Sequence, residues 1–278
     1  MKTVKRKLDL VVISDIHLGT FGCHAKELNR YLGSINPKAI VLNGDIIDIW
    51  QFRKSYFPTS HIKVLKKILS FAASGIKVYY ITGNHDEMLR KFSDAFVGNF
   101  AIVDKIVLEI DGKKTWIFHG DVFDSSVTHA KWIAQLGGYG YDYLILMNRL
   151  VNWCLQKMGR PPYSFSKKIK ANVKAATKHI SNFETTAAEL AIENGYDYVI
   201  CGHIHEPQIK IVQNHFGSTT YLNSGDWIEN LSALEYSKNK WSIYKYADDL
   251  NLKNQIEKNE PEKLLTNADL IQNIVVLR

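Results

Sequence analysis

Residues 78–86, Val-Tyr-Tyr-Ile-Thr-Gly-Asn-His-Asp, decide the fold of this chain. The run of β-branched and aromatic residues predicts a buried strand, and it ends on a glycine followed by three polar side chains. Two interpretations fit this stretch alone: a chain reversal, or a site at the carboxyl end of a strand. An amide, an imidazole and a carboxylate in succession can bind a metal ion or move protons, whereas a chain reversal needs no histidine.

Composition favours a soluble globular protein. The chain has 278 residues, 46% hydrophobic and 23% charged, which suits one large core with a smaller inserted unit. Lysine and arginine total 35 against 28 acidic residues, so the formal charge is +7 and an anionic partner is expected. Phosphate esters, anionic lipid and nucleic acid have the required charge. Nucleic acid is disfavoured because the basic residues gather in one segment and are not interleaved with stacking aromatic residues along a groove.

The cysteines and the N-terminus both favour a cytoplasmic location. Cys23, Cys154 and Cys201 are odd in number and lack CxxC spacing, so neither a disulfide framework nor a thiolate zinc site is expected. The basic N-terminus and the apolar residues 8–13 imitate a signal peptide, but Asp9 interrupts the run and no small-residue cleavage site follows. No stretch is long and apolar enough to span a bilayer, so membrane contact is expected to be peripheral, at the inner face of the cell membrane.

Strands and helices alternate in the first third of the chain, which predicts an α/β fold. Strands are expected at residues 8–13, 39–42 and 78–81. The first two are separated by a helix that includes Leu28, Leu32 and Ile35 and is closed by Pro37, and the next two by a helix over residues 64–72 that ends near Gly75. This order predicts right-handed crossovers and a largely parallel sheet, in which ligands bind beyond the carboxyl ends of the strands.

Further strands follow in the second half of the chain. Residues 106–110 and 115–118 predict a hairpin joined by residues 111–114, and residues 198–201 predict another buried strand. The β segments at residues 220–222, 231–236 and 241–246 are expected to complete a second sheet. The polar residues after Asp248 predict a loosely held tail.

Five of the predicted strand ends carry residues that can bind metal. A single Asp-x-His is more often a turn than a ligand pair, but five such elements, each after its own strand, argue against coincidence. Carboxylate and amide oxygens mixed with imidazoles suit two divalent transition ions such as manganese, iron or zinc. Asp45 is the expected bridge, since a shared carboxylate lets two ions lie about 3.5–4 Å apart. Alternate residues of an extended segment face the same way, so each Asp-x-His or His-x-His pair can converge on one centre. The candidates are Asp15, His17, Asp45, Asn84, His119, His203 and His205.

The ordered motifs DxH, GDxxD, GNHD, HGD and GHxH over residues 8–230 resemble those of the calcineurin-like metallophosphoesterases. The resemblance implies a four-layer αββα sandwich with a two-metal centre, in which a hydroxide that bridges the ions is the nucleophile. It also implies that His85 is not a ligand, and that Asp48 orients His85 for work on the phosphoryl group or the leaving oxygen. The implied ligands are Asp15, His17, Asp45 and His205 for one ion and Asp45, Asn84, His119 and His203 for the other.

An inserted helical lid is expected at residues 125–185. It divides a core made of residues 1–124 and 186–250, and residues 251–278 form the tail. Apolar residues on more than one helical face, including Trp132, Leu136, Leu146, Leu150 and Trp153, precede a series of lysines. Two interpretations remain: a helical subdomain with its own small core and a solvated lysine face, or a lid that holds an acyl chain or a membrane surface, with lysines for anionic head groups.

Residues 168–176 narrow the resemblance to the bacterial UDP-2,3-diacylglucosamine diphosphatases of lipid A synthesis and their paralogues. This resemblance implies that Lys170, Asn172 and Lys174 contact the sugar or the phosphates. Two residues depart from the lipid A enzymes, which typically have GDxxE and GNRD where this chain has Asp48 and His85. An arginine can hold a phosphate but cannot donate a proton at neutral pH, whereas a histidine can.

The sequence therefore favours a two-metal hydrolase of a phosphoester or pyrophosphate bond, which releases UMP and a lipid monophosphate from a nucleotide-linked glycolipid such as UDP-2,3-diacylglucosamine. One alternative keeps the chemistry and changes the substrate to another nucleotide or a membrane-derived phosphoester. Another is a nonenzymatic scaffold with a decayed metal site, which the complete set of ligands disfavours. Manganese is the expected metal, with iron or zinc as alternatives.

Overall fold

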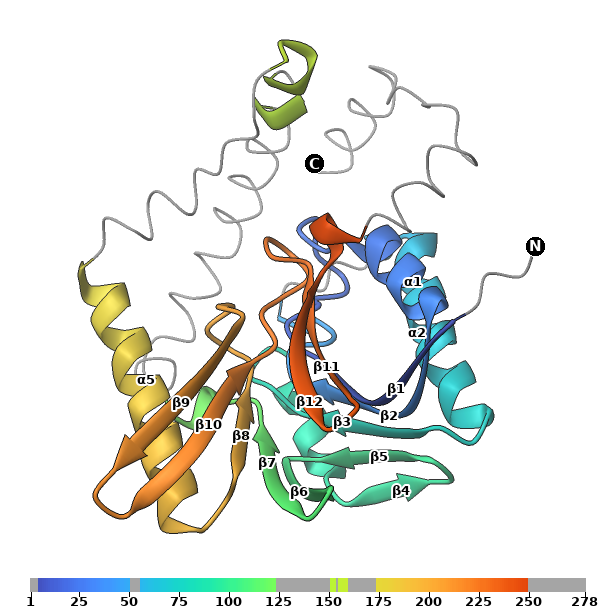
Figure 1. Ribbon diagram of the computed structural model, residues 1–278. Coiled ribbons are helices and arrows are strands. Elements are labelled where there is room, and N and C mark those ends of the chain that lie inside the picture. The colour runs from blue at the N-terminus through green and yellow to red at the C-terminus, as the bar shows by residue number, and fades with distance from the viewer. Residues whose placement is uncertain (1–4, 51–55, 124–150, 154, 160–173, 250–278) are drawn as a thin grey trace.

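The computed structural model describes residues 5–50, 56–123, 151–153, 155–159 and 174–249, with the side chains of residues 174–182 left undescribed. Its strands form two sheets that pack face to face (Figure 1). The seven-stranded sheet has the order β12-β11-β1-β2-β3-β5-β4 and the five-stranded sheet the order β6-β7-β8-β10-β9. The strands of the first are β12 (Lys240–Lys245), β11 (Ser232–Ser237), β1 (Arg6–Ile13), β2 (Ile35–Asn43), β3 (Lys77–Ile81), β5 (Phe100–Val103) and β4 (Ala95–Val97). Those of the second are β6 (Lys105–Ile110), β7 (Lys113–Phe118), β8 (Tyr198–Cys201), β10 (Gly217–Asn223) and β9 (Gln208–Asn214).

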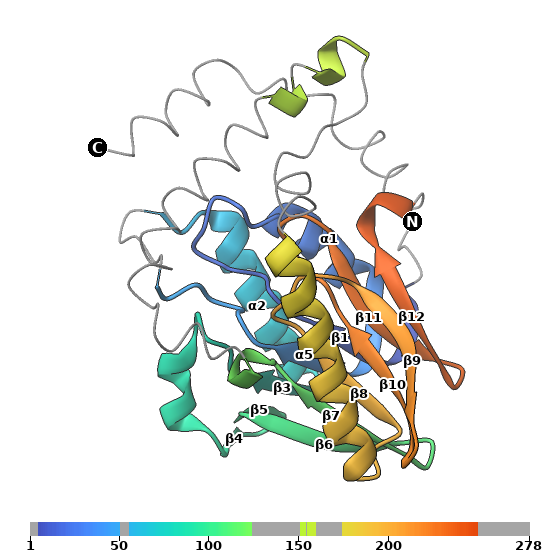
Figure 2. The same cartoon turned by 90° about the vertical axis from the view of Figure 1, so that its left-hand side faces the viewer.

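Helices cover the outer face of each sheet. α1 (Ala25–Ser34) and α2 (Thr59–Ala73) lie on the seven-stranded sheet, and α5 (Lys174–Glu193) lies on the five-stranded sheet (Figure 2). The described residues also include three short 3-10 helices, η1 (Glu87–Phe92), η2 (Asp121–Phe123) and η3 (Tyr246–Asp248), and helical residues at 151–153 and 155–157.

Three apolar clusters hold these four layers together. Residues such as Leu28, Val64 and Ile40 fill the space between α1, α2 and the first sheet. The second cluster, with Val12 from the first sheet and Leu222 from the second, lies between the sheets. The third joins α5 to the second sheet. This architecture confirms the expected αββα sandwich, because each sheet has one face on the other sheet and one face under helices.

The parallel core of the first sheet is as predicted. β1, β2, β3 and β5 pair in parallel, and α1 and α2 make the first two crossovers. The hairpin of β6 and β7 also forms, with a shorter turn than expected. Asp111 and Gly112 have φ angles of 50° and 75°, the left-handed backbone that an Asp-Gly turn between antiparallel strands favours. Strands β4, β5 and β9 were not predicted.

Two predicted details are wrong. β11 and β12 do not join the second sheet: β11 pairs antiparallel with β1, and of the three late β segments only β10 lies in the five-stranded sheet. β11 is almost fully buried, with Ala233 in the helix-side core and Leu234 between the sheets, as expected of a strand inside a sheet and not at its edge. The seven-stranded sheet provides this position, because β1 pairs with one edge of β11 and β12 with the other.

The second correction concerns Pro37. α1 ends at Ser34, and Ile35 and Pro37 already belong to β2. A proline is accommodated there because it lies at the start of the strand, opposite Leu8 of β1, and β3 pairs with β2 only from Ala39 onward.

α5 (Lys174–Glu193) crosses the expected boundary between the lid, which ends at residue 185, and the core, which resumes at residue 186. From Phe183 onward its described side chains pack on the five-stranded sheet. Most of the expected lid at residues 125–185 lies outside the described residues, so this division of the chain stays a prediction.

Candidate metal centre

The predicted ligands gather where the carboxyl ends of strands from both sheets meet. Backbone hydrogen bonds continue past the strands and connect one ligand segment to the next. Asp15 N donates to Gly44 O at 3.1 Å, His17 N to Asp45 O at 2.9 Å, and Gly202 N to His119 O at 2.9 Å. The spacing of the ligand segments is therefore set by backbone bonds, the least adjustable contacts in the fold.

Six of the seven predicted ligands fall into two groups whose candidate ligand atoms lie within 4.8 Å of one another. One group is Asp15, His17 and His205, and the other is Asp45, His119 and His203. The two histidines of the His-x-His motif, His203 and His205, thus belong to different groups, whereas the sequence allowed both to converge on one centre. Asn84, the seventh, is buried, and the residue after it, His85, donates its backbone N–H to Asp45 Oδ1 at 2.8 Å.

Buried atoms of these residues make no hydrogen bond within the described part of the chain. They include Nε2 of His17, Nε2 of His119 and Oδ1 of Asn84. Burying such atoms without a partner costs free energy, so native proteins rarely leave several together. Two imidazole nitrogens and an amide oxygen are donors that divalent transition ions accept, and the site therefore fits the metal that its motifs predicted.

Hydrogen bonds at the far side of two imidazole rings fix which nitrogen faces the site. His119 Nδ1 lies 2.9 Å from the carbonyl oxygen of Asn43, and His17 Nδ1 lies 3.1 Å from Asp48 Oδ2. A carbonyl oxygen can only accept, so His119 donates from Nδ1, and its Nε2 is free to bind a cation when the ring is neutral. The Asp48 carboxylate selects the same orientation for His17.

The backbone at the ligands is left-handed, which corrects the expectation of extended segments. The φ angles are 52° at Asp15, 52° at His17, 54° at Asp45, 63° at His203 and 55° at His205. Non-glycine residues adopt this conformation at a cost that the surrounding structure has to offset, and such residues concentrate at functional sites. Asn230 illustrates the support, because its Nδ2 donates to His205 O at 2.7 Å.

Glycines beside the ligands leave room that a side chain would fill. A Cβ atom on Gly44 would lie 2.2 Å from His119 Nδ1. On Gly83 it would lie 2.3 Å from Asp45 Oδ1, and on Gly202 it would lie 2.7 Å from Asp15 Oδ2. The glycines of the three motifs are therefore required by close approach of ligand side chains.

Opposite charges hold the buried ligands in their ionised states. Burial alone would raise the pKa of Asp45, but the neighbouring His119, His85 and His17 imidazoles lower that pKa well below its ordinary value. Burial alone would lower the pKa of His119, yet the Asp45 and Asp15 carboxylates raise it to about 10. The carboxylates thus attract positive charge into a buried site, and protons or metal ions can supply it.

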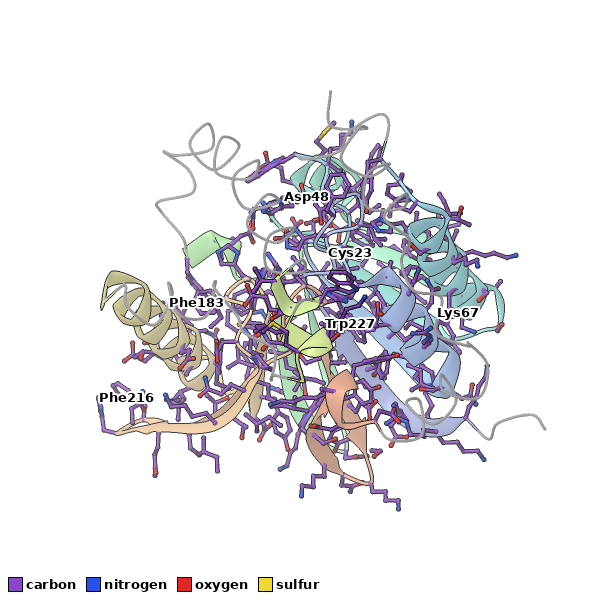
Figure 3. All side chains as sticks on the ribbon, turned by 90° about the horizontal axis from the view of Figure 1, so that it is seen from above. Cys23, Asp48, Lys67, Phe183, Phe216 and Trp227 are labelled. Carbon is purple, nitrogen blue, oxygen red and sulfur yellow. The ribbon has the colours of Figure 1, made fainter. Side chains whose placement is uncertain are left out.

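Asp48 and His85 lie together beside the ligands, as the resemblance implied. His85 Nδ1 is 2.9 Å from Asp48 Oδ2, the oxygen that His17 also approaches. The His85 side chain is 20% exposed against 6% for that of His17, so it is the more accessible of the two rings. The ring of Trp50 lies 4.6 Å from that of His85. Figure 3 shows Asp48 in the segment between β2 and α2, and Phe183 on α5.

Asp86 has a part in the site that its sequence position did not predict. This buried carboxylate accepts hydrogen bonds from Gly83 N at 2.6 Å, Ile46 N at 2.9 Å and the Tyr80 hydroxyl at 2.6 Å. Burial and the nearby Asp45 raise its pKa. Asp86 therefore connects the segments that follow β2 and β3. A carboxylate three residues after a glycine in a tight turn is the local signal that could have indicated this role.

The predicted substrate contacts fall largely outside the described structure. Lys170 and Asn172 lie outside the described residues, and Lys174 begins α5 with its side chain undescribed. Of the apolar lid residues, Trp153 is described, and Lys157 Nζ lies 4.4 Å from its ring centroid.

A family model described as calcineurin-like phosphoesterase matches residues 8–207. The chain belongs to this family. UDP-2,3-diacylglucosamine hydrolase of Aliivibrio fischeri (strain MJ11) is 24% identical over 245 residues, which cover 86% of this chain and 98% of that relative. The protein of the same name from Blochmanniella pennsylvanica (strain BPEN) is 25% identical over 252 residues, which cover 83% and 93%. A solved structure, the E. coli phosphoesterase Yfce, aligns with a TM-score of 0.43 and 15% identity, covering 86% of this chain and 93% of that one.

Membership of this family makes the chain a phosphoester hydrolase that depends on divalent metal ions. The grouping of aspartate and histidine side chains described above agrees with that chemistry. Within the described residues, none of the helices combines the length and the apolar character needed to cross a bilayer.

We predict that Gly83→Ala folds but loses metal and activity. The new Cβ would lie 2.6 Å from the Asp45 backbone nitrogen, so the two strand-end segments have to separate. Misplacement by about 1 Å can lower a rate about 10²-fold. The measurement is metal content per chain together with kcat/KM on a nitrophenyl phosphodiester. Gly33→Ala in α1 is the control, because nothing lies within 4 Å of its Cβ position. Parental metal content and rate in Gly83→Ala would contradict the prediction.

Proposed function

We propose that this protein is a two-metal hydrolase that cleaves the pyrophosphate bond of UDP-2,3-diacylglucosamine or a closely similar nucleotide-linked glycolipid, releasing UMP and a lipid monophosphate. The observation that carries the proposal is the convergence of six aspartate and histidine side chains that follow four strands, with buried Asn84 after a fifth; several of these residues have an atom that makes no hydrogen bond within the described part of the chain. Support for the substrate comes from the relatives named UDP-2,3-diacylglucosamine hydrolase. The alignments with this chain cover 98% and 93% of the two relatives reported above.

Two metal subsites share Asp45 in this proposal. Subsite A consists of Asp15, His17, Asp45 and His205, and subsite B of Asp45, Asn84, His119 and His203. The geometry of Asp45 supports the sharing: its Oδ2 lies 3.9 Å from His17 Nε2 and 3.4 Å from His119 Nε2, one imidazole from each subsite. Divalent ions held here, manganese before iron or zinc, supply Lewis acidity to the phosphoryl oxygens and activate water.

His85 is the proposed proton donor to the leaving oxygen. Asp48 holds Nδ1 of the ring, which leaves Nε2 as the nitrogen that can give a proton to a substrate. Asp45 also fixes the position of the residue, because its Oδ1 accepts a hydrogen bond from His85 N at 2.8 Å. His85 is thus held at two points: Asp48 contacts Nδ1 of its ring, and Asp45 accepts a hydrogen bond from its backbone N–H.

The same site supports a second candidate, hydrolysis of a different nucleotide or membrane-derived phosphoester. The pairing of Asp48 with His85 favours it, since the lipid A enzymes typically have glutamate and arginine at these positions. A proton donor is needed most when the leaving group is a poor one, such as an alkoxide. Whether residues 125–185 bind acyl chains is part of the first candidate and remains a prediction.

We predict that Asp45→Ala abolishes hydrolysis and lowers the metal content at both subsites, because the shared carboxylate neutralises charge between two cations. Metal per chain is measured on the purified variant after dialysis in the presence of buffered Mn²⁺. The control is Glu109→Ala, which removes an exposed carboxylate on β6. Two ions retained per chain in Asp45→Ala would show that Asp45 does not bridge.

We predict that His85→Ala keeps both metal ions but slows turnover by about 10²–10⁴-fold, the typical effect of losing general acid help. The loss should be smaller for a nitrophenyl phosphoester than for an alkyl phosphoester, because nitrophenolate leaves without a proton. Rates on both substrates are measured at saturating metal. Equal losses on the two substrates would assign His85 to substrate positioning and not to proton donation.

The substrate is tested with a matched pair, UDP-2,3-diacylglucosamine and UDP-glucosamine, by measuring the release of UMP. Each buried methylene contributes about 0.8 kcal/mol, so five of them raise kcat/KM by about 10³-fold for the acylated compound. A chain that acts on the glycolipid should show this preference. Equal rates on the two compounds would favour a soluble nucleotide substrate, and no release from either would favour another phosphoester.

A further inference from the structure

Arg90 connects two segments that follow strands of different sheets. It lies on η1, shortly after Asn84 and His85. Its Nη2 donates to Asp121 Oδ2 at 2.9 Å, and its Nε donates to Thr82 Oγ1 at 3.3 Å. Thr82 follows β3 of the seven-stranded sheet, whereas Asp121 follows β7 of the five-stranded sheet. One guanidinium group therefore joins the segment that carries Asn84 to the segment that carries His119.

A polar network keeps this guanidinium group in place. Asp104, in the link where the chain passes from β5 to β6, has its Oδ1 3.3 Å from Arg90 Nε. The same oxygen accepts from Thr82 Oγ1 at 2.8 Å and from Ser93 Oγ at 2.9 Å. The Thr82 hydroxyl thus accepts from Arg90 and donates to Asp104. The network spans the junction between the two sheets at the edge of the metal centre.

The bond to Asp121 is the strongest contact in the network. The Asp121 side chain is 11% exposed and that of Arg90 is 35% exposed, so solvent screens this ion pair less than it screens a surface pair. A charged donor on a charged acceptor also gives a shorter and stronger bond than a neutral pair. The planar guanidinium reaches Asp121 and Thr82 in different directions at once, which the single ammonium group of a lysine cannot reproduce.

We propose that Arg90 is a positioning residue for subsite B, acting through Asp121 and Thr82 without touching an ion or the substrate. The inference rests on the proposed function, which defines subsite B. Asn84 and His119 come from different sheets, and a ligand pair of this kind binds an ion well only when its separation is fixed before the ion arrives. Arg90 fixes that separation from outside the site.

The test uses the full chain and Mn²⁺ alone. Arg90→Met, Arg90→Lys, Asp121→Asn and the double variant Arg90→Met/Asp121→Asn are dialysed against a series of buffered Mn²⁺ concentrations, and metal per chain is measured by mass spectrometry. We expect one of the two binding steps to weaken about 10–100-fold in Arg90→Met, the typical effect of losing a residue that orients a ligand. Arg90→Lys should not restore it. The double variant should be no worse than the weaker single variant, because both remove the same bond.

Arg6→Met is the matched control. Arg6 Nη1 lies 2.8 Å from Glu235 Oε2, and the two side chains are 38% and 8% exposed, close to the values for Arg90 and Asp121. Arg6→Met should lower the thermal stability of the metal-free protein and leave both Mn²⁺ affinities unchanged. Weakening of Mn²⁺ binding to the same extent in Arg6→Met would reduce Arg90 to a general structural role and overturn the proposal.

Single-subsite backgrounds identify which ion Arg90 supports. In His205→Ala, which keeps subsite B whole, adding Arg90→Met should weaken the remaining ion; in His203→Ala, which keeps subsite A whole, it should have no effect. The opposite pattern overturns the proposal, as does a higher KM with both ions retained, which would make Arg90 a substrate contact. Fewer than two Mn²⁺ bound by the unsubstituted chain would instead contradict the two-metal function itself.

Discussion

The buried carboxylate of Asp45 is the constraint on which this structure depends. Its Oδ2 lies 3.4 Å from His119 of the second sheet and 3.9 Å from His17 of the first, and its Oδ1 accepts a bond from the His85 backbone. A charge enclosed to this degree is strongly destabilising unless opposite charge is brought to it. The two sheets must therefore pack so that the strand ends carrying His17 and His119 both lie beside Asp45. Left-handed backbone at the ligands, and glycines where Cβ atoms would collide, follow from that requirement.

The candidate site was largely predictable because its signals are local. An apolar strand that ends on glycine and a metal-binding side chain can be recognised in a few residues, and the parallel order of the first sheet brings such ends to one edge. Sheet membership is not local. The sequence of β11 does not show that its partner is β1, more than 200 residues away, and Pro37 does not reveal that β3 pairs with β2 only from Ala39.

Residues that hold the candidate ligand segments in place were harder to predict than the candidate ligands themselves. Asp86, Asn230 and Arg90 act by hydrogen bonds to backbone or to other side chains, and the geometry of those bonds exists only once the chain has folded. Asp86 and Asn230 stabilise segments of the left-handed type, which no motif spacing indicates. A motif thus predicts which atoms can bind a metal ion. The fold determines how firmly those atoms are held in position before a metal ion binds.

The single oxygen of Asp48 connects this positioning to the chemistry. Its Oδ2 lies 3.1 Å from Nδ1 of His17, a proposed ligand of subsite A, and 2.9 Å from Nδ1 of His85. An arginine in place of His85 would put a fixed positive charge at that oxygen but would have no proton to give at neutral pH. The lipid A enzymes typically have glutamate and arginine at the positions of Asp48 and His85, so both members of the pair differ. In this chain Asp48 Oδ2 contacts His17, a proposed metal ligand, and also His85, which can protonate a leaving oxygen. Under the proposed function, leaving-group chemistry is therefore the property most sensitive to this pair.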